Sequence, residues 1–290
     1  MYSYKINKLP KKTVEVIVKI AAGDIKREED IAFEKLLQNL EVAGFRKGKV
    51  PKDVAKKNIS RQAIYEQIIK KLLPQLYEEI IKKENLKPII SPKIELIKAK
   101  EGEDWEIKFT IALKPDFILP DYKNLIKKLK NEQKKTDIWL PGKNQPSSSN
   151  DDKEEGKQKL LNNILEKLLL ETKIEIPDLL IEEELNRRLT NLLDDIRKIG
   201  LTVEGYLKSK NTTIEQLKQN ISKEIEDTYK LEFILGEIAD LENIQVDKED
   251  LNKLFANITD NNQRQEAEKN SYFYAAILRK QKTFDFLLNL

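Results

Sequence analysis

Residues 12–20 of the chain read KTVEVIVKI. Apolar and polar side chains alternate along this stretch, and its apolar residues are β-branched, which is typical of a strand with one buried face. Two further strand-like runs, residues 93–100 and 105–113, are separated by the sequence EGED, which is typical of a hairpin turn. We therefore expect a small antiparallel sheet in the first part of the chain.

Helical patterns lie between the first strand and this hairpin. Residues 24–43 carry apolar groups on one helical face, Pro51 restarts a helix at a tolerated first-turn position, and Ser60 is expected to cap a helix through Ile81. Pro74 lies inside that last helix and predicts a kink. Strand, helices and hairpin in this order predict an α+β domain over residues 1–120, with helices on a small antiparallel sheet.

The remainder of the chain is different in kind. Residues 121–135 are compatible with a short basic helix, but residues 140–152 read LPGKNQPSSSNDD, which is the composition of a linker. Residues 121–157 are too short and too polar for a core of their own. Residues 158–290 read throughout as helix, so we expect an all-α domain of long helical arms.

Several helix ends in this second part are marked by specific residues. Pro177 is expected to open a long helix that Gly200 ends, and Thr202 starts a short helix. Thr212 and Glu215 have the spacing of a capping box for the next helix.

The residue composition excludes several kinds of chemistry. The 290 residues contain no cysteine and no histidine, so disulfides, thiolate nucleophiles, Ser-His-Asp triads and His or Cys metal sites are absent. No phosphate-binding GxxxxGK[ST] loop is present. We expect a binding protein with no catalytic residues, no metal and no cofactor.

Hydropathy and charge indicate the compartment and the partners. The first twelve residues, MYSYKINKLPKK, lack a secretory apolar stretch, and no window approaches a membrane span, so a cytoplasmic protein without a membrane partner is expected. Residues 1–120 carry 25 Lys and Arg against 18 Asp and Glu, whereas residues 158–290 carry 19 against 25. A polyanionic partner would therefore meet the front of the chain, although ordinary surface charge explains the same counts.

The segment GFRKGKVP, residues 44–51, interrupts the helical pattern. It presents Phe45, Arg46, Lys47 and Lys49 together, and its glycines allow a tight turn. An aromatic side chain beside three cations suits an RNA–protein surface, where the cations engage phosphates. The alternative is a solvated basic loop with Phe45 buried in the protein's own core.

GFRKGKVP resembles the ribosome-docking motif of the trigger factor family of bacterial chaperones. Further resemblances lie on both sides of the middle segment, in the sequences LPDYKNL at 119–125, IPDLLIEEEL at 176–185, LGEIA at 235–239 and FDFLL at 284–288. Most of the family carries an FKBP-like prolyl-isomerase domain between the two halves. Residues 121–157 cannot contain such a domain, so the resemblance is to a short form that is not an enzyme.

The resemblance implies an ATP-independent chaperone that docks beside the ribosomal exit tunnel and shields hydrophobic nascent chains. The partners would be the large ribosomal subunit, through an exit-tunnel protein and rRNA, and unfolded nascent polypeptides; a weak homodimer is left open. The implied ribosome-binding residues are Gly44, Phe45, Arg46, Lys47, Gly48 and Lys49.

Candidate residues for contact with nascent chains are apolar or aromatic residues of the helical arms, and ordinary helix packing explains each of them as well. They are Leu189, Leu193, Tyr206, Phe255, Tyr272, Phe273 and Tyr274. The alternatives are a free cytosolic holdase or assembly factor, an enzyme with prolyl-isomerase activity, and an RNA-binding protein that acts away from ribosomes.

Overall fold

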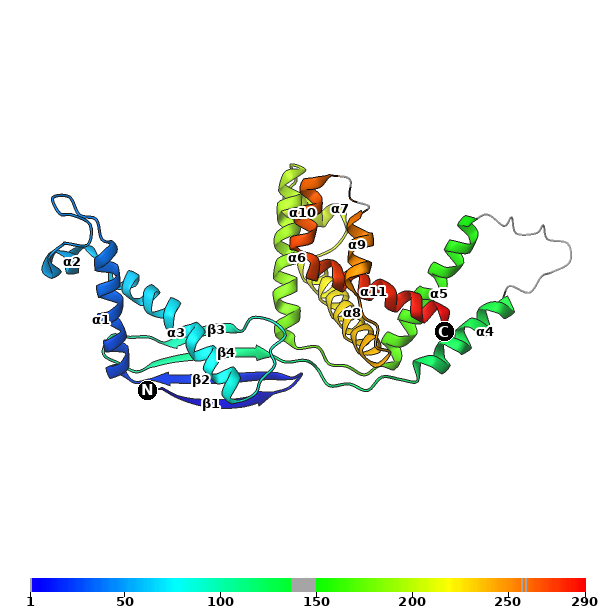
Figure 1. Ribbon diagram of the computed structural model, residues 1–290, viewed down its shortest axis with the longest axis horizontal. Helices are drawn as coiled ribbons and strands as arrows, with labels where there is room; N and C mark the ends of the chain where they lie inside the picture. The colour runs from blue at the N-terminus through cyan, green and yellow to red at the C-terminus, as the bar shows by residue number, and fades with distance from the viewer. Residues whose placement is uncertain (1, 137–149, 257, 259) are drawn as a thin grey trace. The chain divides into compact units, whose positions relative to one another are not determined.

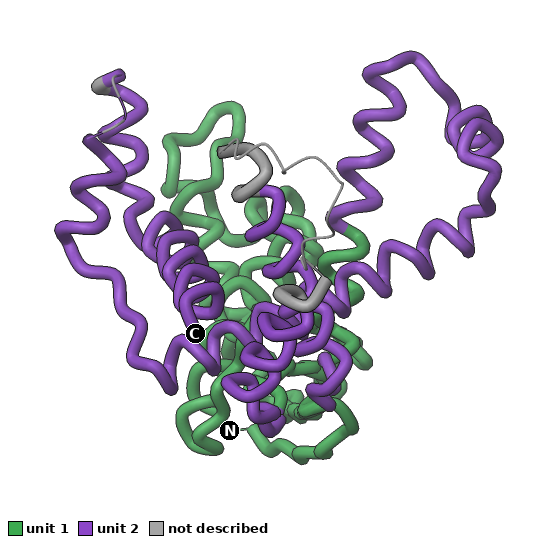
Figure 2. Tube along the Cα trace, turned by 90° about the vertical axis from the view of Figure 1, so that its right-hand side faces the viewer, with its two compact units in different colours: residues 1–115, 177–186 green, residues 116–176, 187–290 purple. Residues whose placement is uncertain are grey.

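The structure is a computed structural model that describes residues 2–136, 150–256, 258 and 260–290. Contacts divide the chain into two compact units (Figures 1 and 2). Unit 1 comprises residues 1–115 and 177–186, and unit 2 comprises residues 116–176 and 187–290. The expected fold class, an α+β part followed by an all-α part, is confirmed.

Unit 1 is built on a four-stranded antiparallel sheet. The strands are β1 (Tyr2–Leu9), β2 (Thr13–Ile20), β3 (Lys93–Lys98) and β4 (Trp105–Ala112), in the order β1-β2-β4-β3. The predicted first strand and hairpin are confirmed. Strand β1, which was not among the predicted strands, pairs along its whole length with β2, from Tyr2 opposite Ile20 to Leu9 opposite Thr13.

Helices cover one face of this sheet, as Figure 1 shows. They are α1 (Ala22–Asn39) and α3 (Arg61–Lys83), with the short α2 (Lys52–Asn58) between them in sequence. Alternate residues of β2 and β4 form the buried face, together with side chains from α1 and α3. The largest of these are Trp105, Phe109, Ile68 and Ile80.

Two helix boundaries in unit 1 test the sequence predictions directly. Ser60 caps α3 as predicted, since its side chain accepts a hydrogen bond from the Ala63 N–H at 3.2 Å. Helix α1 ends at Asn39, four residues earlier than expected, because Leu40 adopts an extended conformation (φ −72°, ψ 130°). Residues 40–51 are thereby left as the connection to α2.

Among the described residues of unit 2, the regular secondary structure is all helical. Its helices are α4 (Tyr122–Thr136), α5 (Asn150–Glu171), the part of α6 (Asp178–Lys198) from residue 187, α7 (Val203–Ser209), α8 (Ile214–Leu241), α9 (Lys248–Ala256), α10 (Asn261–Lys269) and α11 (Ser271–Asn289). The core combines four of them, and its buried side chains are Tyr122, Leu125, Ile126, Ile164, Leu168, Ile234, Leu235, Ile238 and Leu287.

The basic helix expected over residues 121–135 is present as α4, and its role is larger than that of a tether. Its apolar side chains Tyr122, Leu125 and Ile126 are buried in the core of unit 2. The most linker-like sequence, residues 137–149, lies outside the described residues. The functional division at residues 120 and 157 stays a prediction.

The helix ends of unit 2 mostly follow the predicted signals. Gly200, with φ 73°, donates to the Arg197 carbonyl, and the Leu201 N–H donates to Ile196, as in a Schellman motif. The predicted capping box at Thr212 and Glu215 was wrong by one residue. Thr213 is the N-cap of α8, and its side chain and that of Gln216 satisfy each other's backbone N–H groups.

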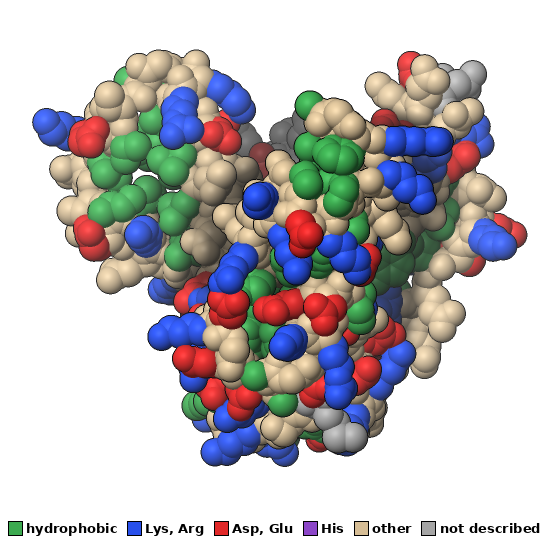
Figure 3. Space-filling view, turned by 90° about the vertical axis from the view of Figure 1, so that its left-hand side faces the viewer, with side chains coloured by type: hydrophobic (Ala, Val, Ile, Leu, Met, Phe, Trp, Pro, Cys, Tyr) green, Lys and Arg blue, Asp and Glu red, His purple; other side chains and the backbone are tan. Residues whose placement is uncertain are grey.

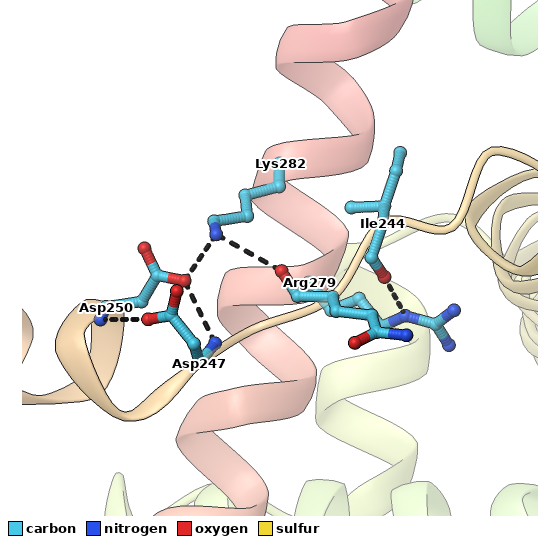
Figure 4. Close-up of polar contacts among 6 residues, drawn as sticks. Ile244, Asp247, Asp250, Arg279 and Lys282 are labelled. Carbon is cyan, nitrogen blue, oxygen red and sulfur yellow. Dashed lines mark hydrogen bonds and ion pairs between the residues drawn. The ribbon is translucent and has the colours of Figure 1, made fainter.

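Two cations of α11, Arg279 and Lys282, bind residues of the connection between α8 and α9 and of the helices beside it (Figure 4). Arg279 donates from Nη2 to Asp240 at 2.6 Å and from Nε to the carbonyl of Ile244 at 2.8 Å. Lys282 pairs with Asp250, which in turn accepts a hydrogen bond from the Asp247 N–H at 3.1 Å.

Among the described residues, none of the helices is both long and apolar enough to cross a membrane.

Candidate functional site: an exposed basic loop and an apolar groove

Residues 44–51, which we name the docking loop, form most of the connection between α1 and α2 in unit 1. Three backbone hydrogen bonds shape residues 40–49, and we call residues 40–48 the neck of the loop. The Phe45 N–H donates to Val42 at 3.0 Å, the Gly48 N–H to Leu40 at 3.4 Å, and the Lys49 N–H to Arg46 at 2.9 Å. The loop is therefore a defined sequence of tight turns.

A small apolar cluster anchors the base of the loop, and it is separate from the core on the sheet. Its buried members are Leu37, Val50 and Ala55, and the partly buried residues around them are Phe33, Leu40, Val42, Val54 and Ile59. All of them belong to α1, the connection over residues 40–51, α2 or the residue after α2. The loop is thus held by residues close to it in sequence.

Both glycines of the motif adopt backbone conformations that L side chains rarely adopt. Gly44 has φ 88° and Gly48 has φ 73°. A Cβ at Gly48 would lie 2.9 Å from the backbone oxygen of Gln38, in the last turn of α1, whereas a Cβ at Gly44 would meet nothing within 4 Å. Gly48 is required both by its φ angle and by this close approach.

The tip of the loop presents the side chains that the sequence singled out. Phe45 is 42% exposed, so it is not buried in the protein's own core. Arg46, Lys47 and Lys49 are exposed beside it. The structure thus brings the aromatic ring and three cations together at the surface, while their binding role stays a prediction.

The cations near the loop differ in their electrostatic partners. Lys47 Nζ lies 2.9 Å from the Glu41 carboxylate, and Lys52 in α2 pairs with Glu34 of α1. The hydrogen bond to Glu34 raises the pKa of Lys52. Within the described part of the chain, no carboxylate lies within ion-pair distance of Arg46 or Lys49. Figure 3 shows that acidic and basic side chains are interspersed over the visible face of the molecule, as they are in the ion pairs of Lys47 and Lys52.

The seven candidates for nascent-chain contact do not form one surface in unit 2. Phe255 is 4% exposed and packs edge-on against the ring of Tyr274 at 5.6 Å. Tyr272 and Phe273 are 90% and 62% exposed, and Leu193 is 39% exposed. Leu189, Tyr206 and Tyr274 are partly buried. Ordinary packing therefore accounts for Phe255, and the exposed residues remain candidates.

An apolar groove between α8 and α11 contains one of these candidates, Phe273. Its volume is about 440 Å³. Leu235, Gly236 and Ala239 of α8 line one side, and Phe273, Ala276 and Ile277 of α11 line the other. The sequence did not reveal the groove, although Gly236 within a long helix was a signal, since a residue without a side chain leaves space at a helix face.

Charges at the groove rim are paired with each other. Lys280 of α11 lies 3.8 Å from Glu232 of α8, and Arg279 is held by Asp240 at 2.6 Å. The groove therefore offers apolar contact with little net charge at its edges. Across the described residues, no three Asp or Glu side chains cluster closely enough to hold a metal ion.

Comparison with known proteins places the chain in a family. The family model "Bacterial trigger factor protein (TF)" matches residues 2–138, and the model "Bacterial trigger factor protein (TF) C-terminus" matches residues 143–289. Only residues 139–142 lie between the two matches. The N- and C-terminal parts thus follow each other without a domain between them.

Individual relatives agree with these models. Trigger factor of Streptococcus pneumoniae (strain Hungary19A-6) is 35% identical over 118 residues, which are 41% of this chain and 28% of the relative. That of Lactococcus lactis subsp. cremoris (strain MG1363) is 37% identical over 101 residues, which are 35% of this chain and 24% of the relative. The match thus spans about a quarter of the length of these relatives.

A solved structure of the trigger factor chaperone shares the fold. Its TM-score is 0.60 at 16% sequence identity, over 98% of this chain and 99% of that chain. The two family models together span nearly the whole sequence, and we conclude that the chain belongs to the trigger factor family, in a short form without a middle domain.

Proposed function

We propose that this protein is an ATP-independent cytoplasmic chaperone that docks at the ribosomal exit tunnel and shields apolar segments of nascent chains. One observation carries the docking part: a half-exposed phenylalanine stands among exposed cations on a loop fixed by two glycines of positive φ. Membership of the trigger factor family supports the chaperone role.

The loop has the physical means for a weak, reversible contact. A phenylalanine buries about 150–250 Å² when fully covered, so covering the 42% of Phe45 that is exposed would contribute on the order of 2 kcal/mol. Each cation that meets an RNA phosphate releases counterions, which adds affinity at low salt and removes it at high salt. Docking should therefore weaken steeply with ionic strength.

Ribosome co-sedimentation over a salt series tests the docking proposal. The triple variant Phe45→Ala, Arg46→Ala, Lys47→Ala should lose most of its binding and show a shallower salt dependence than the wild type. The matched control is Lys5→Ala with Lys8→Ala, which removes two exposed cations of β1 instead of two from the loop. Unchanged co-sedimentation of the triple variant would instead favour the alternative, a free cytosolic holdase.

We place the contact with client chains at the groove between α8 and α11. Its apolar lining and paired rim charges suit apolar segments of varied sequence, because the contact demands neither a charge nor a hydrogen-bonding pattern from the client. Such contacts are individually weak, which allows release without ATP.

Suppression of aggregation of an unfolded reporter protein tests this placement. Phe273→Ser with Ile277→Ser should raise the amount of chaperone needed for half-maximal protection several-fold. Tyr272→Ser is the control, because Tyr272 is 90% exposed on the same helix and does not line the groove. Equal loss from both variants would place client contact on the exposed helix surface rather than in the groove.

Two further parts of the proposal concern activities and partners. A proline-peptide exchange assay should show no acceleration of cis/trans isomerisation, and acceleration would mean that the protein is an enzyme. Salt-sensitive binding to generic RNA as strong as binding to ribosomes would favour a role in RNA binding away from ribosomes.

A further inference from the structure

We propose that Glu41 is a built-in competitor of the ribosome for Lys47, so that it withholds one of the loop's three cations from the phosphates of ribosomal RNA and keeps docking reversible. The inference rests on the proposed docking function. It assigns a role in affinity to a carboxylate that lies outside the docking loop itself.

The backbone of the loop neck places these two residues opposite each other. The hydrogen bond from Gly48 N to Leu40 O joins the two ends of the neck, and residues 41 and 47 are the next pair inside it. Lys47 Nζ accordingly lies 2.9 Å from Glu41 Oε1. The Phe45 N–H to Val42 O bond closes the turn between them. The ion pair is thus set by the same turns that shape the loop.

The pair is exposed on both sides, with side-chain exposures of 56% for Lys47 and 72% for Glu41. Such a pair is weak, because water screens it and two long side chains must be held in place. A phosphate of a partner can therefore displace Glu41 from Lys47. The Glu41 carboxylate then stays beside the interface, where its negative charge repels the phosphate.

The three cations of the loop are consequently not equivalent. Among the described residues, Arg46 and Lys49 have no carboxylate within ion-pair distance, whereas Lys47 is partly neutralised before any partner arrives. Counterion release depends on the charge that a protein brings to the phosphates. Lys47 should contribute less to salt-dependent affinity than its exposure suggests, and Glu41 is the reason.

Removal of the competitor should strengthen docking in a measurable way. In Glu41→Gln, the affinity for ribosomes at low salt should rise roughly two- to fivefold, the range that corresponds to one exposed ion pair. The slope of log affinity against log salt should steepen by up to about 0.7–0.9, the range between single-stranded and duplex nucleic acid for one additional phosphate contact. A purely structural role of Glu41 would not steepen this slope.

The experiment compares four proteins by ribosome co-sedimentation at several salt concentrations: wild type, Glu41→Gln, Lys47→Gln and the double variant. Glu78→Gln is the matched control, because Glu78 is an exposed glutamate paired with a lysine, Lys82, at 2.6 Å in unit 1. Glu78 lies near the C-terminal end of α3, about 25 Å along the helix from its first residue, Arg61, which follows α2 in sequence. It removes the same charge without touching the loop.

The inference predicts that Glu41→Gln tightens binding and steepens the slope, that Glu78→Gln does neither, and that the gain disappears in the Lys47→Gln background. An unchanged salt slope, or a gain in affinity that persists without Lys47, overturns the inference. If affinity rises while the slope stays unchanged, the partner of Lys47 would be a single carboxylate of a ribosomal protein instead of an RNA phosphate. If the Phe45, Arg46 and Lys47 triple variant binds normally, the docking proposal itself fails. If that variant loses binding while Glu41→Gln changes nothing, only the role of Glu41 fails.

Discussion

Replacement of Gly48 by alanine tests the reasoning about the docking loop most directly, because two separable penalties act at this position. The first is the positive φ of 73°, which costs an L residue about 1–2 kcal/mol. The second is the approach of the new Cβ to the Gln38 backbone oxygen, at 2.9 Å. Relief of this contact requires movement of the last turn of α1, and such repacking costs about 1–3 kcal/mol. Gly48→Ala should therefore destabilise the loop by about 2–5 kcal/mol.

The chain contains a control that isolates the second penalty. Gly102, in the β3–β4 turn, has φ 72°, almost the same value as Gly48, but a Cβ there would meet nothing within 4 Å. Gly102→Ala should cost only the conformational part, about 1–2 kcal/mol. The difference between the two variants then measures the close approach of Gly48 to α1.

Two measurements together capture the effect. In a Trp139→Phe background, Trp105 is the remaining tryptophan, and it is 1% exposed in the core of unit 1, so its fluorescence in urea reports the unfolding of that unit. If the loop opens locally to relieve the strain, the loss seen by Trp105 is limited, and trypsin should instead cleave faster after Arg46, Lys47 or Lys49. If Gly48→Ala matches Gly102→Ala in both measurements, the reasoning about the close approach is wrong.

Three other predictions concern the stability of the two units. The hydrogen bond to Glu79 raises the pKa of Tyr2 from its usual 10.0 to about 12. The contribution of this hydrogen bond to the stability of unit 1 should therefore be complete below pH 10 and lost as pH rises toward 12. A pH series of urea melts should show this loss of stability, and Tyr2→Phe should abolish it. The hydrogen bond from Lys282 lowers the pKa of Asp250 below its usual 3.8, so unit 2 should lose stability as pH falls through and below that value, and circular dichroism melts of Asp250→Asn should lack this component. Phe109→Ala, at a side chain that is 1% exposed and stacks on Tyr77 at 5.9 Å, should cost unit 1 about 3–5 kcal/mol in urea unfolding followed at Trp105.

Strand β1 shows where the hydropathy pattern was insufficient. Its inward side chains include Tyr2 and Tyr4, whose hydroxyl groups donate to Glu79 of α3 at 2.6 Å and to Glu84, the C-cap residue of α3, at 2.5 Å. Tyr2, Tyr4 and Ile6 pack against the core and alternate with Ser3, Lys5 and Asn7, but two of these three inward residues are tyrosines, so the alternation is less apolar than that of β2. The alternation of residues 12–20, in contrast, follows directly from a face whose valines and isoleucines are buried.

The client-binding candidates failed to converge for a geometric reason. Consecutive residues of a helix point about 100° apart, so Tyr272, Phe273 and Tyr274 cannot share one surface. Only Phe273 faces the groove, and Tyr274 packs on Phe255. The groove also requires Gly236, nearly forty positions earlier in the sequence, and no local pattern reveals that α8 and α11 lie together.

The docking loop could be predicted because everything that shapes it is local. Its anchoring residues lie between Phe33 and Ile59, and its turns depend on Gly44 and Gly48, so the motif carries its own conformation. The ion pair of Lys47 with Glu41 escaped notice because it depends on a hydrogen bond across the neck, not on a recurring spacing. Since the anchoring cluster shares no residue with either larger core, substitutions in the loop should change docking while leaving client binding by unit 2 intact. We therefore predict that, if both proposed functions hold, docking and client binding are separable by mutation in this chain.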